Sequence, residues 1–223
     1  MNYIVIDLEF NQSFDFRTGK KAPSNPLMPL EIIQIGAVKL DGRRNFVDRF
    51  GTTVRPRLYR GLNPFVAKVT GLSKDTLRNS PTFAQAYRGL INFIGKERAT
   101  LCFWGNDDIK ELFRNAMFCR QNIRALPLKY INVQSLASLH LDLPAKQQVA
   151  LSTVVQTLNI RADLPFHSAP NDAFYTAQIF KRVYDEEKVN LLTFDLARLK
   201  QRNEDILVAM ALEAEAAQAE NQV

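Results

Sequence analysis

The chain has 223 residues, 46% of them hydrophobic, and a formal net charge of +6. This length can bury one sizeable core, and two cysteines are too few for a disulfide framework or a zinc-binding set. No apolar run approaches the roughly 20 residues that span a membrane, and the first apolar run meets acidic residues within a few positions. We therefore expect a cytoplasmic protein of one principal domain with no membrane partner.

The first predicted element is a buried strand from Tyr3 to Leu8 with two acidic residues at its end. Asp7 and Glu9 are two positions apart, so along a strand their side chains project from the same face. Two carboxylates this close repel each other unless a cation lies between them, and hard divalent ions such as Mg2+ or Mn2+ prefer oxygen ligands. The pair alone fits a metal site and a solvated strand end equally well, so further acids are needed to decide.

A long connection, residues 11–30, follows this strand and contains one glycine and three prolines. Loops of this length are often functional or disordered. Within it, Phe14 and Phe16 alternate with basic residues that include Lys20 and Lys21, a combination suited to stacking nucleic-acid bases and holding phosphates. The alternative is a mobile loop with two incidental aromatic residues.

The rest of the chain predicts a strand meander followed by alternating helices and strands. Further strands are expected at residues 31–40, 46–54, 100–104 and 129–133. Helices with an apolar stripe at helical spacing are expected to begin near residues 81, 108, 151 and 172. The pattern alone predicts one mixed α/β sheet domain.

Two later segments add acidic residues where a helix begins. Asp107 and Asp108 follow the strand that ends at Trp104. Asp108 lies one turn before Leu112 and leans toward the apolar stripe, whereas Asp107 lies one turn before Glu111 on the solvated face. We therefore expect Asp108 to be a metal ligand and Asp107 to be the helix cap.

The second segment runs from His167 to Asp172 and adds a histidine and a fourth carboxylate just before the last of these helices. A lone histidine is more often structural than functional, and His140, which has no acidic motif beside it, is interpreted in that way. The short spacing from His167 to Asp172 favours a role for His167 at the acidic site.

Five motifs occur in the same order as in a known enzyme superfamily. They are Ile6-Asp7-Leu8-Glu9-Phe10, Glu31 to Val38, Val69-Thr70-Gly71-Leu72, Trp104 to Asp108, and His167 to Asp172. With these motifs, residues 1–185 resemble the DnaQ-like, or DEDDh, 3′→5′ exonuclease superfamily, and within it the Eri-type and KapD-like branch. The Asp107-Asp108 doublet and the long segment between the first two motifs depart from the usual pattern. The resemblance implies a ribonuclease H-like α/β fold, with a mixed five-stranded sheet flanked by helices.

The resemblance also implies the roles of the site residues. Asp7, Glu9, Asp108 and Asp172 would hold two Mg2+ or Mn2+ ions, and His167 would be the general base. In-line phosphodiester hydrolysis suits such a set, because two metals about 3.5 to 4 Å apart activate water, neutralise the nonbridging oxygens and stabilise the leaving oxygen. A histidine fits the remaining proton transfer, since its unperturbed pKa is about 6.5.

Substrate-binding residues follow from the resemblance and from the long loop. In relatives, an apolar residue next to the first motif and the leucine of the Thr-Gly-Leu turn contact the terminal bases. On that resemblance Phe10 and Leu72 are assigned to substrate binding, together with Phe14, Lys20 and Lys21 of the loop. The alternative for Phe10 and Leu72 is a purely structural place in the core.

The charge distribution favours a polyanionic partner. Residues 203–223 contain five acidic and no basic residues, so residues 1–202 carry a formal charge of +11. Four basic residues gather before the Thr-Gly-Leu motif, namely Arg55, Arg57, Arg60 and Lys68. A basic surface around metal-loaded carboxylates attracts nucleic-acid phosphates, although an excess of lysine and arginine also aids solubility.

Residues 189–223 are predicted as a helical extension, acidic and frayed at its end, beyond an exonuclease domain of residues 1–188. A short coiled-coil seam with alternating spacings of four and three is formed by Leu192, Leu196, Leu199, Asn203, Ile206 and Met210. A short helix needs tertiary support, so docking back on the domain is favoured over homodimer formation through this seam.

The motifs and the resemblance together predict a metal-dependent 3′→5′ exonuclease. It would release nucleoside monophosphates from single-stranded 3′ ends, with RNA favoured over DNA because the branch it resembles includes RNA-trimming enzymes. Two alternative functions remain: a non-catalytic nucleic-acid-binding module of the same fold, and a regulator that acts through its C-terminal helix.

Overall fold

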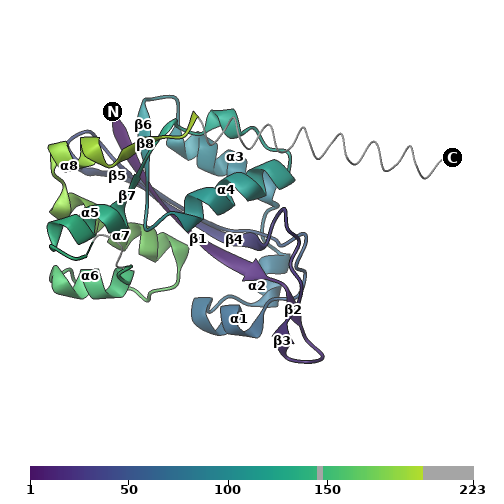
Figure 1. Ribbon diagram of the computed structural model, residues 1–223. Coiled ribbons are helices and arrows are strands. Elements are labelled where there is room, and N and C mark those ends of the chain that lie inside the picture. The colour runs from purple at the N-terminus through teal and green to yellow at the C-terminus, as the bar shows by residue number, and fades with distance from the viewer. Residues whose placement is uncertain (145–147, 198–223) are drawn as a thin grey trace.

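A six-stranded mixed sheet, in the order β5-β4-β1-β6-β7-β8, is the centre of the fold (Figure 1). This computed structural model describes residues 1–144 and 148–197. The sheet consists of β1 (Asn2–Gln12), β4 (Leu30–Leu40), β5 (Phe46–Thr53), β6 (Ala99–Phe103), β7 (Lys129–Asn132) and β8 (Thr193–Asp195). Apolar side chains of β1 are buried on both faces, which is why this strand has a nearly continuous hydrophobic run.

Helices cover both faces of the sheet. One face packs against α3 (Phe83–Ile94) and α4 (Asp107–Phe118). The other face packs against α5 (Val133–His140), α6 (Leu151–Thr157), α7 (Ala169–Val183) and α8 (Glu186–Leu191). Two shorter helices, α1 (Pro64–Thr70) and α2 (Lys74–Arg78), pack around Ile33 of β4. The remaining elements are a small hairpin of β2 (Phe14–Asp15) and β3 (Lys20–Lys21), and a 3-10 turn, η1 (Ile123–Ala125).

Among the described residues, half of β1 has no strand on one side. β4 pairs with β1 antiparallel along almost its whole length, from Tyr3 to Gln12. On the other side, β6 pairs with β1 in parallel, but only from Asn2 to Val5. From Ile6 onward, therefore, one edge of β1 is open to side chains from other elements, and the acidic motifs meet along this edge.

Most of the predicted elements are confirmed, and the differences have local causes. The strand predicted at Tyr3 to Leu8 continues to Gln12, because β4 pairs with it that far, so Asp7 and Glu9 lie inside the strand and not at its end. The predicted strand 129–133 ends at Asn132, whose side chain caps a helix that was not predicted, α5, by accepting a hydrogen bond from Ser135 N.

The sheet has six strands where five were predicted, because the segment expected to continue the C-terminal helix contributes a strand. The prediction of one helix across residues 189–197 is wrong: α8 ends at Leu191, and Thr193–Asp195 pairs antiparallel with β7. Phe194 stacks on Tyr130 and Leu196 is buried in the α3/α4 core, which explains the local preference for the sheet. The other seam positions, Leu199, Asn203, Ile206 and Met210, lie outside the described residues.

Within the described ranges, none of the helices combines the length and the apolar character needed to span a bilayer.

Candidate active site

Asp7 and Glu9 lie on the stretch of β1 that pairs with β4 on one side and, among the described residues, with no strand on the other side. Their spacing predicts that both side chains project from one face of the strand. In agreement, the charge of the same residue, Asp172 at the start of α7, raises the pKa of each carboxylate. In the register with β4, Asp7 lies opposite Gly36 and Glu9 lies opposite Gln34. The sheet therefore fixes both carboxylates beneath the first turn of α7.

The first turn of α4 brings Asp108 to the open edge of β1. Leu8 N, which has no strand partner on that side, donates a hydrogen bond to Asp108 Oδ2 at 3.2 Å. This contact takes the place of a sheet hydrogen bond and holds Asp108 beside the residues that flank Leu8. The third acidic position is therefore Asp108, the member of the doublet that its helical phase predicts.

Asp107 is not the helix cap, contrary to the prediction. It is the first residue of α4, its carboxylate is exposed, and it pairs with Lys110 Nζ at 3.1 Å. Asn106 occupies the cap position but makes no capping hydrogen bond, since its Oδ1 accepts hydrogen bonds from Tyr130 and Asn132. The Asp107 carboxylate is therefore exposed and paired with Lys110, although its charge still adds to the rise in the pKa of Asp108.

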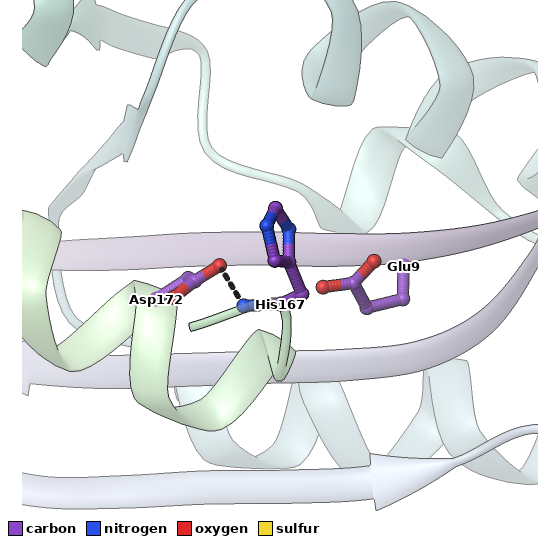
Figure 2. Close-up of side chains that lie close together, drawn as sticks. All are labelled: Glu9, His167 and Asp172. Carbon is purple, nitrogen blue, oxygen red and sulfur yellow. Dashed lines mark hydrogen bonds between the residues drawn. The ribbon is translucent and has the colours of Figure 1, made fainter. Parts of the chain in front are cut away.

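The third segment places a histidine between two carboxylates. His167 N donates to Asp172 Oδ2 at 3.0 Å, and Figure 2 shows the imidazole rising between the carboxylates of Asp172 and Glu9. His167 has φ 62°, in the left-handed region that non-glycine residues seldom adopt and that is enriched at functional sites. Donor atoms of Glu9, His167 and Asp172 all lie within 4.8 Å of one another.

A notch of two glycines allows α7 to approach the sheet closely enough for this contact. A Cβ atom at Gly36 would lie 2.1 Å from the carbonyl carbon of Ala169, and one at Gly51 would lie 2.9 Å from the Pro170 ring. Gln34 Oε1 also accepts a hydrogen bond from Ala169 N at 2.9 Å. No functional role was predicted for Gly36 or Gly51, although a glycine inside a buried strand commonly marks such a close approach.

Burial raises the pKa of all four carboxylates, and the charges of neighbouring acids add to the rise for Asp7, Glu9 and Asp108. Burial, followed by the charges of Asp108, Asp172 and Glu9, raises the pKa of Asp7 well above its usual range. Burial and the neighbouring acids raise the pKa of Asp108 to about 8, and burial and Asp172 raise that of Glu9 to about 7. Burial raises the pKa of Asp172 to about 6, although the His167 N–H lowers it in part. In the metal-free protein, folding therefore disfavours the charged form of each of the four groups.

A divalent cation fits this set of donors. Asp172 Oδ1 is buried and has no hydrogen-bond partner, and a buried acceptor without a partner is costly. In the part of the chain that the structure describes, no lysine or arginine forms an ion pair with any of the four carboxylates. Oxygen donors with uncompensated charge are the ligands that Mg2+ and Mn2+ select.

The candidate substrate-binding residues lie near the same end of β1. Phe10 is half-buried against the α3/α4 core, and Leu72 is half-buried against the small core around Ile33. Both are therefore partly packed and partly accessible. Lys21 belongs to β3, where it pairs with Phe14 in the hairpin.

The hairpin that carries the other candidates is docked on the domain. Phe14 packs edge-to-face on Phe16, whose ring lies so close to Gly61 that a Cβ atom there would come within 2.4 Å. Lys74 Nζ of α2 lies 5.3 Å from the centre of the same ring. These contacts leave Lys20 exposed at the end of the hairpin.

Comparison with known proteins gives one family match and a set of structural likenesses. The family model of the exonucleases (RNase T) matches residues 4–180. Among curated proteins, the probable 3′-5′ exonuclease KapD of Bacillus subtilis (strain 168) is 29% identical over 136 residues, which is 58% of this chain and 62% of KapD. This chain therefore aligns with less than two thirds of the length of that relative.

Two solved structures illustrate the likeness in fold. The nuclease domain of 3′hExo, a DEDDh family member bound to rAMP, has a TM-score of 0.67 and 23% identity, covering 81% of this chain and 90% of that one. Pop2p of S. pombe, in its Mg2+- and Mn2+-bound form, has a TM-score of 0.62 and 15% identity, covering 84% of this chain and 87% of that one. The predicted ribonuclease H-like α/β class is confirmed.

Proposed function

The chain belongs to the exonuclease family, as its motifs indicated, and we propose that it is a metal-dependent 3′→5′ exonuclease that releases nucleoside monophosphates from single-stranded ends. The observation that carries this proposal is the meeting of Asp7, Glu9, Asp108 and Asp172 with His167 along the open edge of β1. These residues come from three distant parts of the sequence, and the fold brings them together along one edge of β1.

The four carboxylates would hold Mg2+ or Mn2+, as two ions. When bound, the ions would neutralise the phosphate oxygens, acidify the attacking water and stabilise the leaving oxygen. The unpartnered Asp172 Oδ1 and the lack of an ion pair to the cluster among the described residues support this assignment. The presence of both metals in Pop2p adds support from a protein of similar fold.

His167 is suited to accept a proton from the attacking water. Its side chain is exposed, and its backbone is tied to Asp172, so the ring is both accessible and positioned. As the water oxygen bonds to phosphorus, His167 takes the water proton and the bond to the 3′ oxygen breaks. The leaving oxygen gains a proton from solvent, and the released nucleotide keeps the phosphate on its 5′ carbon.

The terminal nucleotides would contact Phe10 and Leu72, with Phe14, Lys20 and Lys21 of the hairpin region holding the strand. Half-buried apolar side chains suit base contacts, and an exposed lysine suits phosphate contacts. We propose RNA as the favoured substrate, and the rAMP bound in the 3′hExo structure is consistent with a ribonucleotide at such a site.

Paired RNA and DNA oligonucleotides of one sequence, 5′-labelled and single-stranded, test the proposal in Mg2+, Mn2+ or EDTA. We expect a ladder that shortens from the 3′ end with either metal and intact strands in EDTA, with RNA shortened faster. A non-catalytic binding module would retain strands of full length under every condition. Cleavage of circular strands at the rate of linear ones would contradict the exonuclease assignment.

A further inference from the structure

A cavity of about 790 Å3 lies beside the C-terminal end of α4, away from the carboxylates. Its walls are the start of β4 with Glu31 and Ile32, the last turn of α4 with Asn115 and Cys119, and the surrounding segments that contain residues 54–62, α2 and the start of α3. The volume lies within the range of about 300 to 1,000 Å3 that is typical of small-molecule sites. None of the carboxylates of the candidate active site lines it.

The cavity is separate from the carboxylate cluster but close enough for one nucleic-acid strand to reach both. Asp108 is in the first turn of α4 and Cys119 directly follows its last residue, which places them roughly 16 Å apart at 1.5 Å per residue. On the sheet side, Ile32 in the cavity wall is paired with Phe10 of β1. A ligand in the cavity would therefore lie beyond Phe10, on the side away from Glu9.

The rim of the cavity carries an excess of positive charge. Its basic residues are Arg55, Arg57, Arg60, Lys74 and Arg78. Of the two acids that line it, Asp75 is paired with Arg78 at 2.9 Å. The other, Glu31, is buried and accepts hydrogen bonds from the backbone N–H groups of residues 57, 58 and 59. Among the described residues, no carboxylate forms an ion pair with Arg55, Arg57 or Arg60, so their charges are available to an anion.

The floor of the cavity is apolar. It is formed by Ile32, Val54, Leu62, Leu77, Phe83 and Ala84. The Phe83 ring is stacked on Tyr87 and is fixed in place by that contact. Burial raises the thiol pKa of Cys119 in the inner wall, the guanidinium of Arg57 lowers it, and the charge of Glu31 raises it. The positive charge of Arg57 therefore reaches inside the cavity, alongside the negative charge of Glu31. The cavity thus has an apolar base and cationic walls.

A ligand that uses both parts needs a flat, weakly polar body and an anionic group. Inorganic phosphate would use only the rim, and a purely apolar molecule would leave the arginines without a partner. A nucleotide has both parts, because its base can pack on apolar surface or stack on a guanidinium while its phosphate pairs with arginine.

We propose that this cavity binds a nucleotide unit, with the base on the apolar floor and the phosphate on Arg55, Arg57 and Arg60. The source of the unit rests on the proposed function: it is either an upstream nucleotide of the strand being degraded or a free nucleoside monophosphate. The chemistry of recognition is the same in both cases, and the two sources are separated by experiment.

Calorimetric titration of the full chain in EDTA tests binding independently of hydrolysis. The ligands are AMP, adenosine and inorganic phosphate, and the test variant is Arg55→Glu with Arg60→Glu. The control is Arg43→Glu with Arg49→Glu, an equal change of charge at exposed positions outside the cavity lining. Circular dichroism melts check that both double variants fold.

We expect one AMP per chain, bound at least about tenfold more tightly than adenosine or phosphate, a difference of about 1.4 kcal/mol. The cavity variant should lose about tenfold or more in AMP affinity, and the control should lose less than about twofold. The proposal is overturned if AMP does not bind, if the two double variants weaken it equally, or if phosphate alone binds as tightly as AMP.

Steady-state cleavage then identifies the source of the nucleotide. If it is part of the strand, the cavity variant should raise KM for a ten-nucleotide RNA about tenfold relative to KM for a dinucleotide. If it is a free nucleotide, that ratio should not change, and added AMP should alter the wild-type rate but not the rate of the cavity variant. An inactive protein that still binds AMP in EDTA would overturn the exonuclease proposal and leave the cavity assignment standing.

Discussion

Replacing Asp108 by asparagine should stabilise the metal-free protein at pH 8 while removing its hydrolytic activity. In the absence of a cation, burial, followed by the charges of Glu9, Asp107 and Asp172, raises the pKa of Asp108 to about 8. An asparagine keeps the shape of the side chain, and its Oδ1 can still accept the hydrogen bond from Leu8 N. It carries no charge, however, and cannot serve as an anionic ligand.

The sign of the pH dependence follows from the raised pKa values. Carboxyls titrate near pH 4 in the unfolded chain, whereas those of Glu9 and Asp108 titrate near 7 and 8 in the folded one. Between these values the folded state binds more protons, so the free energy of unfolding in EDTA should fall as the pH rises from about 4 to about 8. The Asp108→Asn variant should show a shallower fall.

The size of the effect can be bounded from the same shift. The pKa of Asp108 rises from 3.8 to about 8, and each pKa unit corresponds to about 1.36 kcal/mol, so ionising this carboxyl costs several kcal/mol in the metal-free protein. Because Asp7, Glu9 and Asp172 still repel one another, we expect asparagine to recover only about 2 kcal/mol at pH 8. For a chain of this size, that gain raises the thermal midpoint by about 4 to 8 °C.

Thermal melts in EDTA at pH 5 and pH 8 measure this gain, with Asp107→Asn as the matched control. Asp107 is adjacent but exposed, and its pair with Lys110 is worth at most about 1 kcal/mol. A saturating amount of Mn2+ should raise the midpoint of the wild type more than that of Asp108→Asn. The reasoning is refuted if Asp108→Asn melts at or below the wild-type temperature in EDTA at pH 8, or if Asp107→Asn gives the same gain.

Four further results are expected. His167→Ala should retain Mn2+ binding but lose roughly a hundred- to ten-thousand-fold in turnover, with partial recovery at higher pH. The control variant His140→Ala should turn over at a near-normal rate. Near-normal turnover of His167→Ala at neutral pH would show that His167 is structural. Asp7→Ala should lose both the calorimetric Mn2+ signal and activity, and an unchanged Mn2+ isotherm would exclude it as a ligand. Gly36→Ala should lower activity and the thermal midpoint because its Cβ would meet the Ala169 backbone at 2.1 Å. Gly89→Ala, which meets only the Phe50 ring at 3.2 Å, should be milder, and equal effects would argue against the notch. A 3′ phosphate on the substrate should slow degradation, since a site built around a terminal hydroxyl has no place for an added dianion, and equal rates would contradict a site of that kind.

The acidic positions could be predicted because each lies where local sequence rules apply. Asp7 and Glu9 alternate with apolar residues of a strand, and Asp108 is the member of the doublet on the buried side of its helix. Asp172 lies in the first turn of an amphipathic helix, and His167 lies just before that helix. Their convergence could be inferred only from the order of motifs in known relatives, because it depends on contacts between residues up to 165 positions apart.

Other features depend on tertiary contacts that no local pattern encodes. The length of β1 follows from its pairing with β4, and the cap of α4 follows from Asn106 bonding to Tyr130 and Asn132. β8 forms where the Phe194 ring stacks on Tyr130 of β7, although the spacing of the leucines in that segment is typical of a helix. The close approach at Gly36 and the basic cavity beside α4 are likewise products of assembled elements.

The most direct test of the proposed exonuclease activity is hydrolysis of a 5′-labelled single-stranded RNA in 18O-enriched water, with Mn2+ present. We expect nucleoside 5′-monophosphates, each with one 18O in its phosphate, released in order from the 3′ end by the wild type and not by Asp108→Asn. The proposed activity is contradicted if the wild type leaves the strand intact, if the phosphate is found on the 3′ oxygen of the products, or if Asp108→Asn releases the same nucleotides at the same rate.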